Sequence, residues 1–153
     1  MFKFLAKLIG TFFYVGYFPL IPGTAGSLTG LLIYFLVKNN VLTYILALSA
    51  LLILGFLACG RVEELVQKKD PPNVVIDEVC GMLLSLLFLP YDIKLVILAF
   101  FIFRTLDTFK PCPIGRLERL KGSRGIMGDD ICAGIYTNIV LQAVVIFASF
   151  KVS

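Results

Sequence analysis

The chain has 153 residues, of which 59% are hydrophobic and only 16% charged, and its net charge at pH 7 is +4. A mean hydropathy of +0.94 excludes an ordinary soluble domain, and the length fits a single domain spanning residues 1–153. The sequence has no histidine and only four widely spaced cysteines, which we expect to be packing residues. Cys/His zinc sites and histidine-based catalysis are therefore excluded, and a metal ion would need oxygen ligands.

The apolar residues form long runs without the strict alternation of strands, so we expect helices. Helices satisfy their own backbone groups inside lipid, whereas open sheets do not. The first 20 residues carry Lys3 and Lys7 among apolar side chains and favour an interfacial amphipathic segment over a cleaved signal peptide. A Pro/Gly loop is expected next, at residues 21–27. The fold class is therefore an all-α integral membrane bundle of about five main helices plus this segment. The main helices are built on the apolar runs at residues 28–37, 41–60, 74–89, 93–103 and 131–150.

Two of these runs, residues 41–60 and 131–150, have the roughly 20 residues that span the roughly 30 Å hydrocarbon core of a bilayer. The two shorter runs between them are expected to form a helical hairpin. If every run crosses the membrane once, all lysines and arginines except Lys38, Lys94 and Lys151 fall on one side, with all acidic residues except Asp92. The positive-inside rule makes that side cytoplasmic.

Two acidic pairs, Asp77-Glu78 and Asp129-Asp130, are expected at helix starts. Either pair alone could simply cap its helix and meet the positive end of the helix dipole. Together the pairs would repel each other unless a cation lay between them. Small residues follow each pair by about one turn and would let the two helices approach closely: Gly81, Ala133 and Gly134. This pattern favours a divalent metal site built from carboxylate oxygens.

Arg104, Asp107 and Lys110 are spaced three residues apart and would share one helix face. Asp107 would lie at the end of its helix, where the dipole disfavours an anion, so a metal ion or Lys110 is expected beside it. The following basic residues can bind phosphate, or can form a solvated face for anionic lipid: Arg116, Arg119, Lys121 and Arg124.

The loop sequence PGTAGS at residues 22–27 leads into a helix, so its backbone N–H groups and the hydroxyls of Thr24 and Ser27 could bind an anion. The GK[ST] ending of a Walker loop is absent, and a plain loop and cap is the alternative. The glutamates at positions 63 and 64 are expected to belong to a solvated helix end. Asp70 is expected either to end that helix or to add to the acidic set.

Three blocks of the sequence, in order, resemble the phosphatidylglycerophosphatase A family of bacterial inner-membrane lipid phosphatases: PGTAGS (22–27), KDPPNVVIDEVCGM (69–82) and RTLDTFKPCPIGRLERLKGSRGIMGDDICAGI (104–135). Segment 121–128 departs from the more glycine-rich turn that is usual in the family. The family pattern carries over to Thr24, Asp77, Glu78, Arg104, Asp107, Lys110, Asp129 and Asp130.

The resemblance implies hydrolysis of the terminal phosphate of phosphatidylglycerophosphate, with one or two Mg²⁺ ions, to give phosphatidylglycerol and inorganic phosphate. It implies a multi-pass protein of the bacterial cytoplasmic membrane, in contact with the lipid bilayer, with its active site on the cytoplasmic side. We expect no nucleic-acid partner and no obligate protein partner.

The hypothesis assigns three overlapping sets of residues. The metal ligands are Asp77, Glu78, Asp107, Asp129 and Asp130. The catalytic residues are Asp129, Asp130, Lys110, Asp107 and Thr24. The phosphate-binding residues are Thr24, Ser27, Arg104, Lys110 and Arg124. The nucleophile is either a water activated by the metal or a carboxylate.

Two other classes of membrane protein fit the sequence less well than a phosphatase does. A CDP-alcohol phosphotransferase would carry the signature DGxxAR followed by GxxxDxxxD, which is missing. A small ion transporter would need ionisable residues within its spans, and the runs at residues 41–60 and 131–150 have none.

Overall fold

The computed structural model describes residues 2–150, with the side chains of residues 3–147. Within this range the chain contains only helices and loops, which confirms the predicted all-α class. The five expected main helices are α2 (Pro22–Val37), α3 (Val41–Val66), α4 (Ile76–Leu86), α5 (Ile93–Phe109) and α7 (Ser123–Phe150). The chain also forms α1 (Phe2–Gly10), a short 3-10 helix (Val15–Tyr17) and α6 (Ile114–Leu117).

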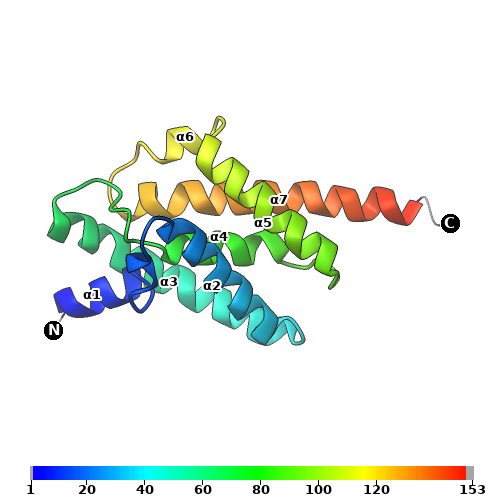
Figure 1. The fold of residues 1–153 in the computed structure, drawn as a ribbon, viewed down its shortest axis with the longest axis horizontal. Coiled ribbons are helices and arrows are strands. Elements are labelled where there is room, and N and C mark those ends of the chain that lie inside the picture. Colours follow the sequence, from blue (N-terminus) through cyan, green and yellow to red (C-terminus); the bar gives the residue numbers. More distant parts are fainter. Residues whose placement is uncertain (1, 151–153) are drawn as a thin grey trace.

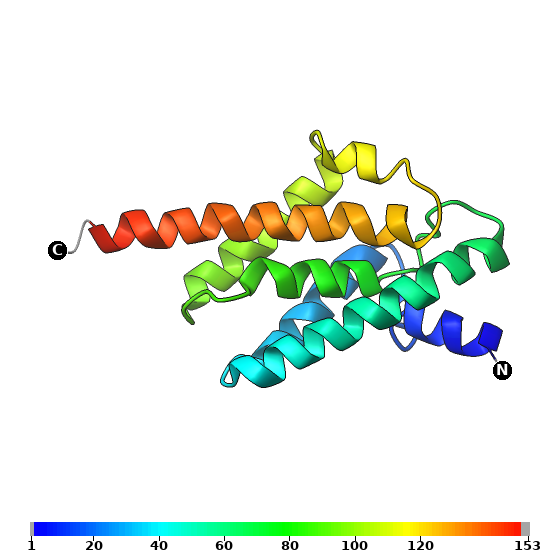
Figure 2. The same cartoon turned by 180° about the vertical axis from the view of Figure 1, so that it is seen from behind.

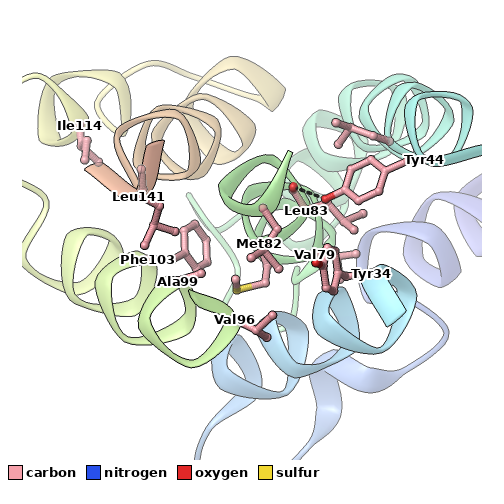
Figure 3. Packing of buried hydrophobic residues seen from close by; sticks show 13 residues of the cluster. Tyr34, Tyr44, Val79, Met82, Leu83, Val96, Ala99, Phe103, Ile114 and Leu141 are labelled. Atoms are coloured by element: carbon pink, nitrogen blue, oxygen red, sulfur yellow. Dashed lines mark hydrogen bonds between the residues drawn. The ribbon is translucent and has the colours of Figure 1, made fainter. Parts of the chain in front are cut away.

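The short helix α4 lies at the centre of the bundle, in contact with α2, α3, α5 and α7 (Figures 1 and 2). Figure 3 shows Met82 and Leu83 of this helix between the aromatic rings of Tyr34 and Tyr44 on one side and Phe103 on the other. The Tyr44 hydroxyl donates a hydrogen bond of 2.6 Å to the carbonyl oxygen of Leu83. The core is thus organised around α4.

The outer surface of the bundle is apolar. Helices α3 and α7 are long and apolar enough to cross a membrane. Large side chains on their outer faces, such as Leu42, Leu57 and Phe147, are each more than 60% exposed. Water would make this surface costly, at about 25 cal/mol per Å², whereas acyl chains would cover it. These features agree with the predicted membrane protein.

The loops of the bundle separate into two ends (Figure 1). The turns at residues 38–40 and 87–92 lie at one end. The segments at residues 67–75 and 110–122 lie at the other, which we call the polar end. The charge pattern predicts this separation of the loops into two ends. The predicted position of Lys151 lies outside the described residues.

Two predicted boundaries are wrong because packing extends the helices. Residues 22–27 are not a loop, since α2 begins at Pro22, where the fixed φ of proline suits the first helical position. Helix α7 begins at Ser123 rather than near residue 131, because Ile126 and Met127 are buried in the core. The pair Asp129-Asp130 therefore lies in the second turn of α7 and does not cap it.

Glycines bring α4 and α7 into backbone contact. A Cβ atom on Gly134 would lie 2.5 Å from the carbonyl oxygen of Gly81, and one on Gly81 would lie 2.8 Å from that of Asp130. Real Cβ atoms are not found this close to a backbone oxygen. The predicted close approach of these two helices is therefore confirmed, and it places the acidic start of α4 beside Asp130.

Helix α4 ends in the middle of the bundle, because its 11 residues span only about 16 Å. The Asn138 side chain donates hydrogen bonds to the carbonyl oxygens of Ser85 (3.2 Å) and Leu87 (2.8 Å). Gln142 lies one turn further along α7 and donates to the carbonyl oxygens of Leu87 and Phe88, both at 3.4 Å. Side chains of α7 thus donate hydrogen bonds to the free carbonyl groups at the end of α4. Lipid acyl chains could not supply such donors.

Replacing Asn138 by leucine is therefore expected to lower the free energy of unfolding by about 1–3 kcal/mol, since the part-buried Ser85 carbonyl loses its side-chain donor and the Leu87 carbonyl loses the nearer of its two. Thermal unfolding in detergent would measure the loss. The control is Val140→Leu, at an outward-facing position of the same helix, which should leave the melting temperature unchanged. Equal melting temperatures for the two variants would contradict the capping role.

Candidate active site

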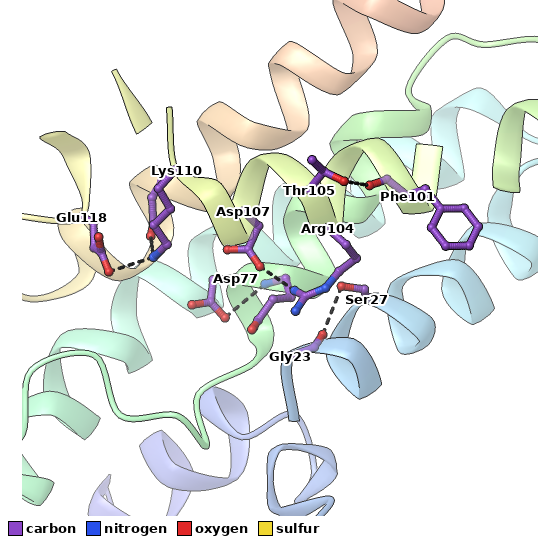
Figure 4. Close-up of polar contacts among 11 residues, drawn as sticks. Gly23, Ser27, Asp77, Phe101, Arg104, Thr105, Asp107, Lys110 and Glu118 are labelled. Carbon is purple, nitrogen blue, oxygen red and sulfur yellow. Dashed lines mark hydrogen bonds and ion pairs between the residues drawn. The ribbon is translucent and has the colours of Figure 1, made fainter. Parts of the chain in front are cut away.

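The polar residues predicted as a site gather at the polar end of the bundle (Figure 4). Asp77 and Glu78 come from the first turn of α4, and Asp129 and Asp130 from the second turn of α7. Arg104, Asp107 and Lys110 come from the end of α5, where Lys110 is the C-cap residue. The first turn of α2 completes the arrangement, so four elements meet here.

Three carboxylates form a compact cluster. Asp77, Glu78 and Asp130 each offer one oxygen atom, and these atoms all lie within 4.8 Å of one another. Asp77 and Asp130 are only 5% and 3% exposed. One oxygen of Glu78 (Oε2) and one of Asp130 (Oδ1) are buried without a hydrogen-bond partner. Buried acceptors without partners are costly, so this carboxylate trio fits a metal ion with oxygen ligands.

The protonation of the trio reflects its burial. Burial and the nearby charge of Asp107 raise the pKa of Glu78 to about 7, against the opposing effects of Asp77 and Arg104. Burial and the adjacent Glu78 raise the pKa of Asp77 well above its usual range. A cation would favour the ionised carboxylates and so displace their protons.

Two basic side chains lie beside the trio, each held by carboxylates (Figure 4). The Lys110 ammonium lies 2.8 Å from Asp129 and 2.9 Å from Glu118. The Arg104 guanidinium is paired with Asp107 on the same helix. Lys110 has a positive φ of 44°, which ends α5 and turns the chain back toward α6 and Glu118. The site therefore places cationic groups next to an anionic cluster.

The first turn of α2 lies against both charged groups. A Cβ atom on Gly23 would lie 2.6 Å from Oε1 of Glu78 and 3.3 Å from both terminal nitrogens of Arg104. Thr24 is half-buried in the same turn. Ser27 is fully buried, and its hydroxyl donates to the carbonyl oxygen of Gly23 (3.1 Å). The Ser27 hydroxyl proton is thus hydrogen-bonded within α2. The phosphate-binding role of Ser27 stays a prediction.

A methyl group at position 23 is expected to disturb the site without unfolding the bundle, because the atoms it meets are the ends of flexible side chains. We expect Gly23→Ala to lower kcat by about 10-fold or more, since small misplacements of polar groups are costly in active sites. The matched control is Gly128→Ala, where the nearest atom would be 3.8 Å away. Equal activity of the two variants would argue against a functional contact at Gly23.

The structure brings together three of the five predicted metal ligands. Asp107 and Asp129 are instead ion-paired with Arg104 and Lys110, although Oδ1 of Asp129 is buried without a hydrogen-bond partner. Arg124 lies in the first turn of α7 with its side chain exposed. The functional roles of these residues stay predictions.

Two further acidic residues belong to the polar end. Glu118 was not predicted, because it meets Lys110 only after the chain reverses. Glu63 is not part of a solvated helix end as expected: its Oε1 accepts a hydrogen bond from the Gly122 amide (3.2 Å), and its Oε2 is buried without a partner. Glu64 is exposed, as expected.

Comparison with known proteins agrees with the geometry of the site. The family model described as phosphatidylglycerophosphatase A matches residues 8–145. A Bacteroides thetaiotaomicron protein named "Putative phosphatidylinositol-3-phosphatase" is 37% identical over 148 residues, covering 91% of this chain and 92% of the relative. The phosphatidylglycerophosphatase A of Escherichia coli is 34% identical (88% and 80% covered), and that of Haemophilus influenzae is 32% identical (80% and 78% covered). No solved structure matches the chain significantly.

Proposed function

Because the chain belongs to the phosphatidylglycerophosphatase A family, we propose that this phosphatase removes the terminal phosphate of phosphatidylglycerophosphate, giving phosphatidylglycerol and inorganic phosphate. The observation that carries the proposal is the carboxylate trio beside Lys110 and Arg104 at one end of an apolar bundle. Carboxylates suit a divalent cation and the basic groups suit a phosphate.

In this proposal Asp77, Glu78 and Asp130 hold Mg²⁺, with Asp107 and Asp129 close by. The buried oxygens of Glu78 and Asp130 without partners support this assignment. A bound magnesium ion would neutralise charge on the phosphoryl group and activate a water for attack. Hard oxygen ligands alone do not separate magnesium from manganese or calcium, so the experiment below compares them.

The other residues of the site would bind and orient the phosphate. Lys110 and Arg104 would donate to phosphoryl oxygens as negative charge develops. Asp129 and Asp107 hold these two side chains in place. Thr24 and the free amides of the first turn of α2 would face the phosphate from the opposite side.

The lipid would remain in its leaflet during the reaction. The site lies at the polar end, where the loops carry most of the basic residues, and the positive-inside rule assigns such an end to the cytoplasm. We propose that the protein is a multi-pass protein of the bacterial inner membrane, with the site on the cytoplasmic face. The apolar outer surface would contact the acyl chains.

The test is phosphate release from phosphatidylglycerophosphate by the purified protein in detergent. We expect activity to disappear in EDTA and to return with added Mg²⁺, and we expect Ca²⁺ to restore less, because it prefers larger and more irregular coordination. Full activity in EDTA would overturn the metal assignment. Absence of phosphate release under every condition would overturn the proposed reaction.

A second substrate follows from the Bacteroides relative, whose printed name concerns a phosphoinositide. Phosphatidylinositol 3-phosphate also presents a phosphomonoester on a lipid headgroup, so the same cluster could act on it. Assays of both lipids at equal concentration, in the same detergent, separate the two. We expect the higher kcat/KM with phosphatidylglycerophosphate, and the reverse order would reassign the substrate.

A further inference from the structure

A cavity with mainly apolar walls and a few polar side chains lies away from the carboxylate trio. It has a volume of about 360 Å³ and is lined by α1, the end of α3 and the segment that follows α3. In Figure 2, α1 runs alongside the C-terminal half of α3, and the segment 67–75 leaves from the end of α3. The cavity shares no lining residue with the trio. Its size is that of a pocket for a small ligand or headgroup.

The polar groups of this cavity are suited to an anion. They come from Lys7, Thr11, Tyr17, Lys68 and Asn73, and the lining contains no aspartate or glutamate. The Lys7 ammonium lies 5.5 Å from the centre of the Tyr17 ring. Neither lysine forms an ion pair with a carboxylate of the described residues. The lining therefore includes two solvent-exposed lysines without a counterion from the described part of the chain.

The backbone separates this cavity from the candidate active site. The Val75 amide donates a hydrogen bond of 3.0 Å to the carbonyl oxygen of Gly10, which ties the segment before α4 to the end of α1. Gly16 also packs against this segment, since a Cβ atom there would overlap the carbonyl of Asn73. The two sites therefore lie on either side of residues 73–75.

The neighbouring surface is suited to lipid. Between α1 and α2 the chain exposes large apolar side chains, of which Phe13 is 68%, Phe18 55% and Leu20 98% exposed. Tyr14 and Tyr17 lie in the same segment, and tyrosine is enriched where a protein crosses the membrane surface. Residues 13–20 would thus contact acyl chains while the adjacent lysines face headgroups, a pattern that favours an intact lipid over a soluble anion.

We propose that this cavity binds the headgroup of an anionic phospholipid, at a site separate from the one that carries out phosphate hydrolysis. Lys7 and Lys68 would contact the phosphodiester, and the Tyr17 hydroxyl and Asn73 amide would donate hydrogen bonds to the headgroup. A lipid held there would join α1 to the segment between α3 and α4.

Native mass spectrometry of the detergent-purified protein in EDTA tests the proposal, with phosphatidylglycerol and phosphatidylcholine added separately. We compare Lys7→Gln/Lys68→Gln with Lys69→Gln/Lys94→Gln, which removes the same charge from residues that do not line the cavity. We expect the first phosphatidylglycerol to bind the Lys7/Lys68 variant about 30-fold more weakly than wild type, because each lysine near a membrane surface contributes a similar favourable contact. The control variant should bind like wild type, and phosphatidylcholine should bind weakly to all three proteins.

Equal weakening in both double variants would show only general electrostatic attraction and would overturn the site. Unchanged binding in the Lys7/Lys68 variant would do the same. A third arm adds millimolar inorganic phosphate: if this displaces the lipid fully, the cavity is a site for free phosphate and the lipid assignment is wrong. Wild-type phosphatase activity and melting temperature in the Lys7/Lys68 variant would show that it is folded and that the hydrolytic site is intact.

Discussion

Asp130→Asn is expected to reduce phosphatase activity by more than about 100-fold while making the metal-free protein more stable. Changes even to the groups that support metal ligands cost about 10- to 100-fold, and Asp130 is itself one of the three clustered carboxylates. The amide keeps the shape of the side chain but removes one charge from a buried cluster of like charges. In EDTA we expect the melting temperature to rise by about 2–4 °C, the shift that about 1 kcal/mol produces in a chain of this size.

The control for this prediction is Asp92→Asn, at the opposite end of the bundle. Asp92 caps α5 by accepting a hydrogen bond from the Lys94 amide, and asparagine caps a helix about as well. Activity and melting temperature should stay at the wild-type level. An Asp130→Asn variant that remained active with magnesium, or that melted at a lower temperature in EDTA, would contradict a cation-binding role for the trio.

The opposite effects on stability and activity are what separate a functional cluster from a structural one. Carboxylates that only capped helices would be stabilising, and their removal would lower the melting temperature. Asp130 lies in the second turn of α7, beyond the free amides of the helix start. Its burial beside Asp77 and Glu78 therefore does not stabilise the helix. A bound cation would offset the free-energy cost of burying these carboxylates together.

Much of this arrangement could be predicted from the sequence because it depends on local pattern. The uncharged runs in α3 and α7 indicated long helices without reference to other elements. Gly81 and Gly134 follow the acidic pairs by about one turn, so the close approach of α4 and α7 could be inferred before any contact was known. The three clustered carboxylates were all among the predicted metal ligands.

The parts that could not be predicted depend on tertiary packing. Residues 123–128 contain two glycines and look like a loop, but burial of Ile126 and Met127 makes them helical. Glu118 meets Lys110 only because Lys110 adopts a left-handed conformation that reverses the chain. Spacing in the sequence contains no signal for such contacts, since the two residues belong to different elements.

Lys110→Ala is expected to lower kcat by about 100- to 1,000-fold, the range for removing one preorganised donor to a developing charge. The same change should destabilise the fold, because Asp129 would keep a buried charge without its cation. Breaking a buried ion pair in this way typically costs about 3–5 kcal/mol, and the Asp129 side chain is only 6% exposed. Loss of activity alone would therefore not distinguish phosphate binding from support of Asp129.

A double variant makes that distinction. In Lys110→Ala/Asp129→Asn the uncompensated charge is gone, so thermal unfolding should return most of the way to wild type. If Lys110 binds the phosphate, kcat of the double variant should stay well below that of Asp129→Asn alone, in spite of restored stability. Recovery of both quantities together would mean that Lys110 only neutralises Asp129. The exposed Lys121 provides the control for loss of a positive charge at the polar end, and Lys121→Ala should leave kcat unchanged.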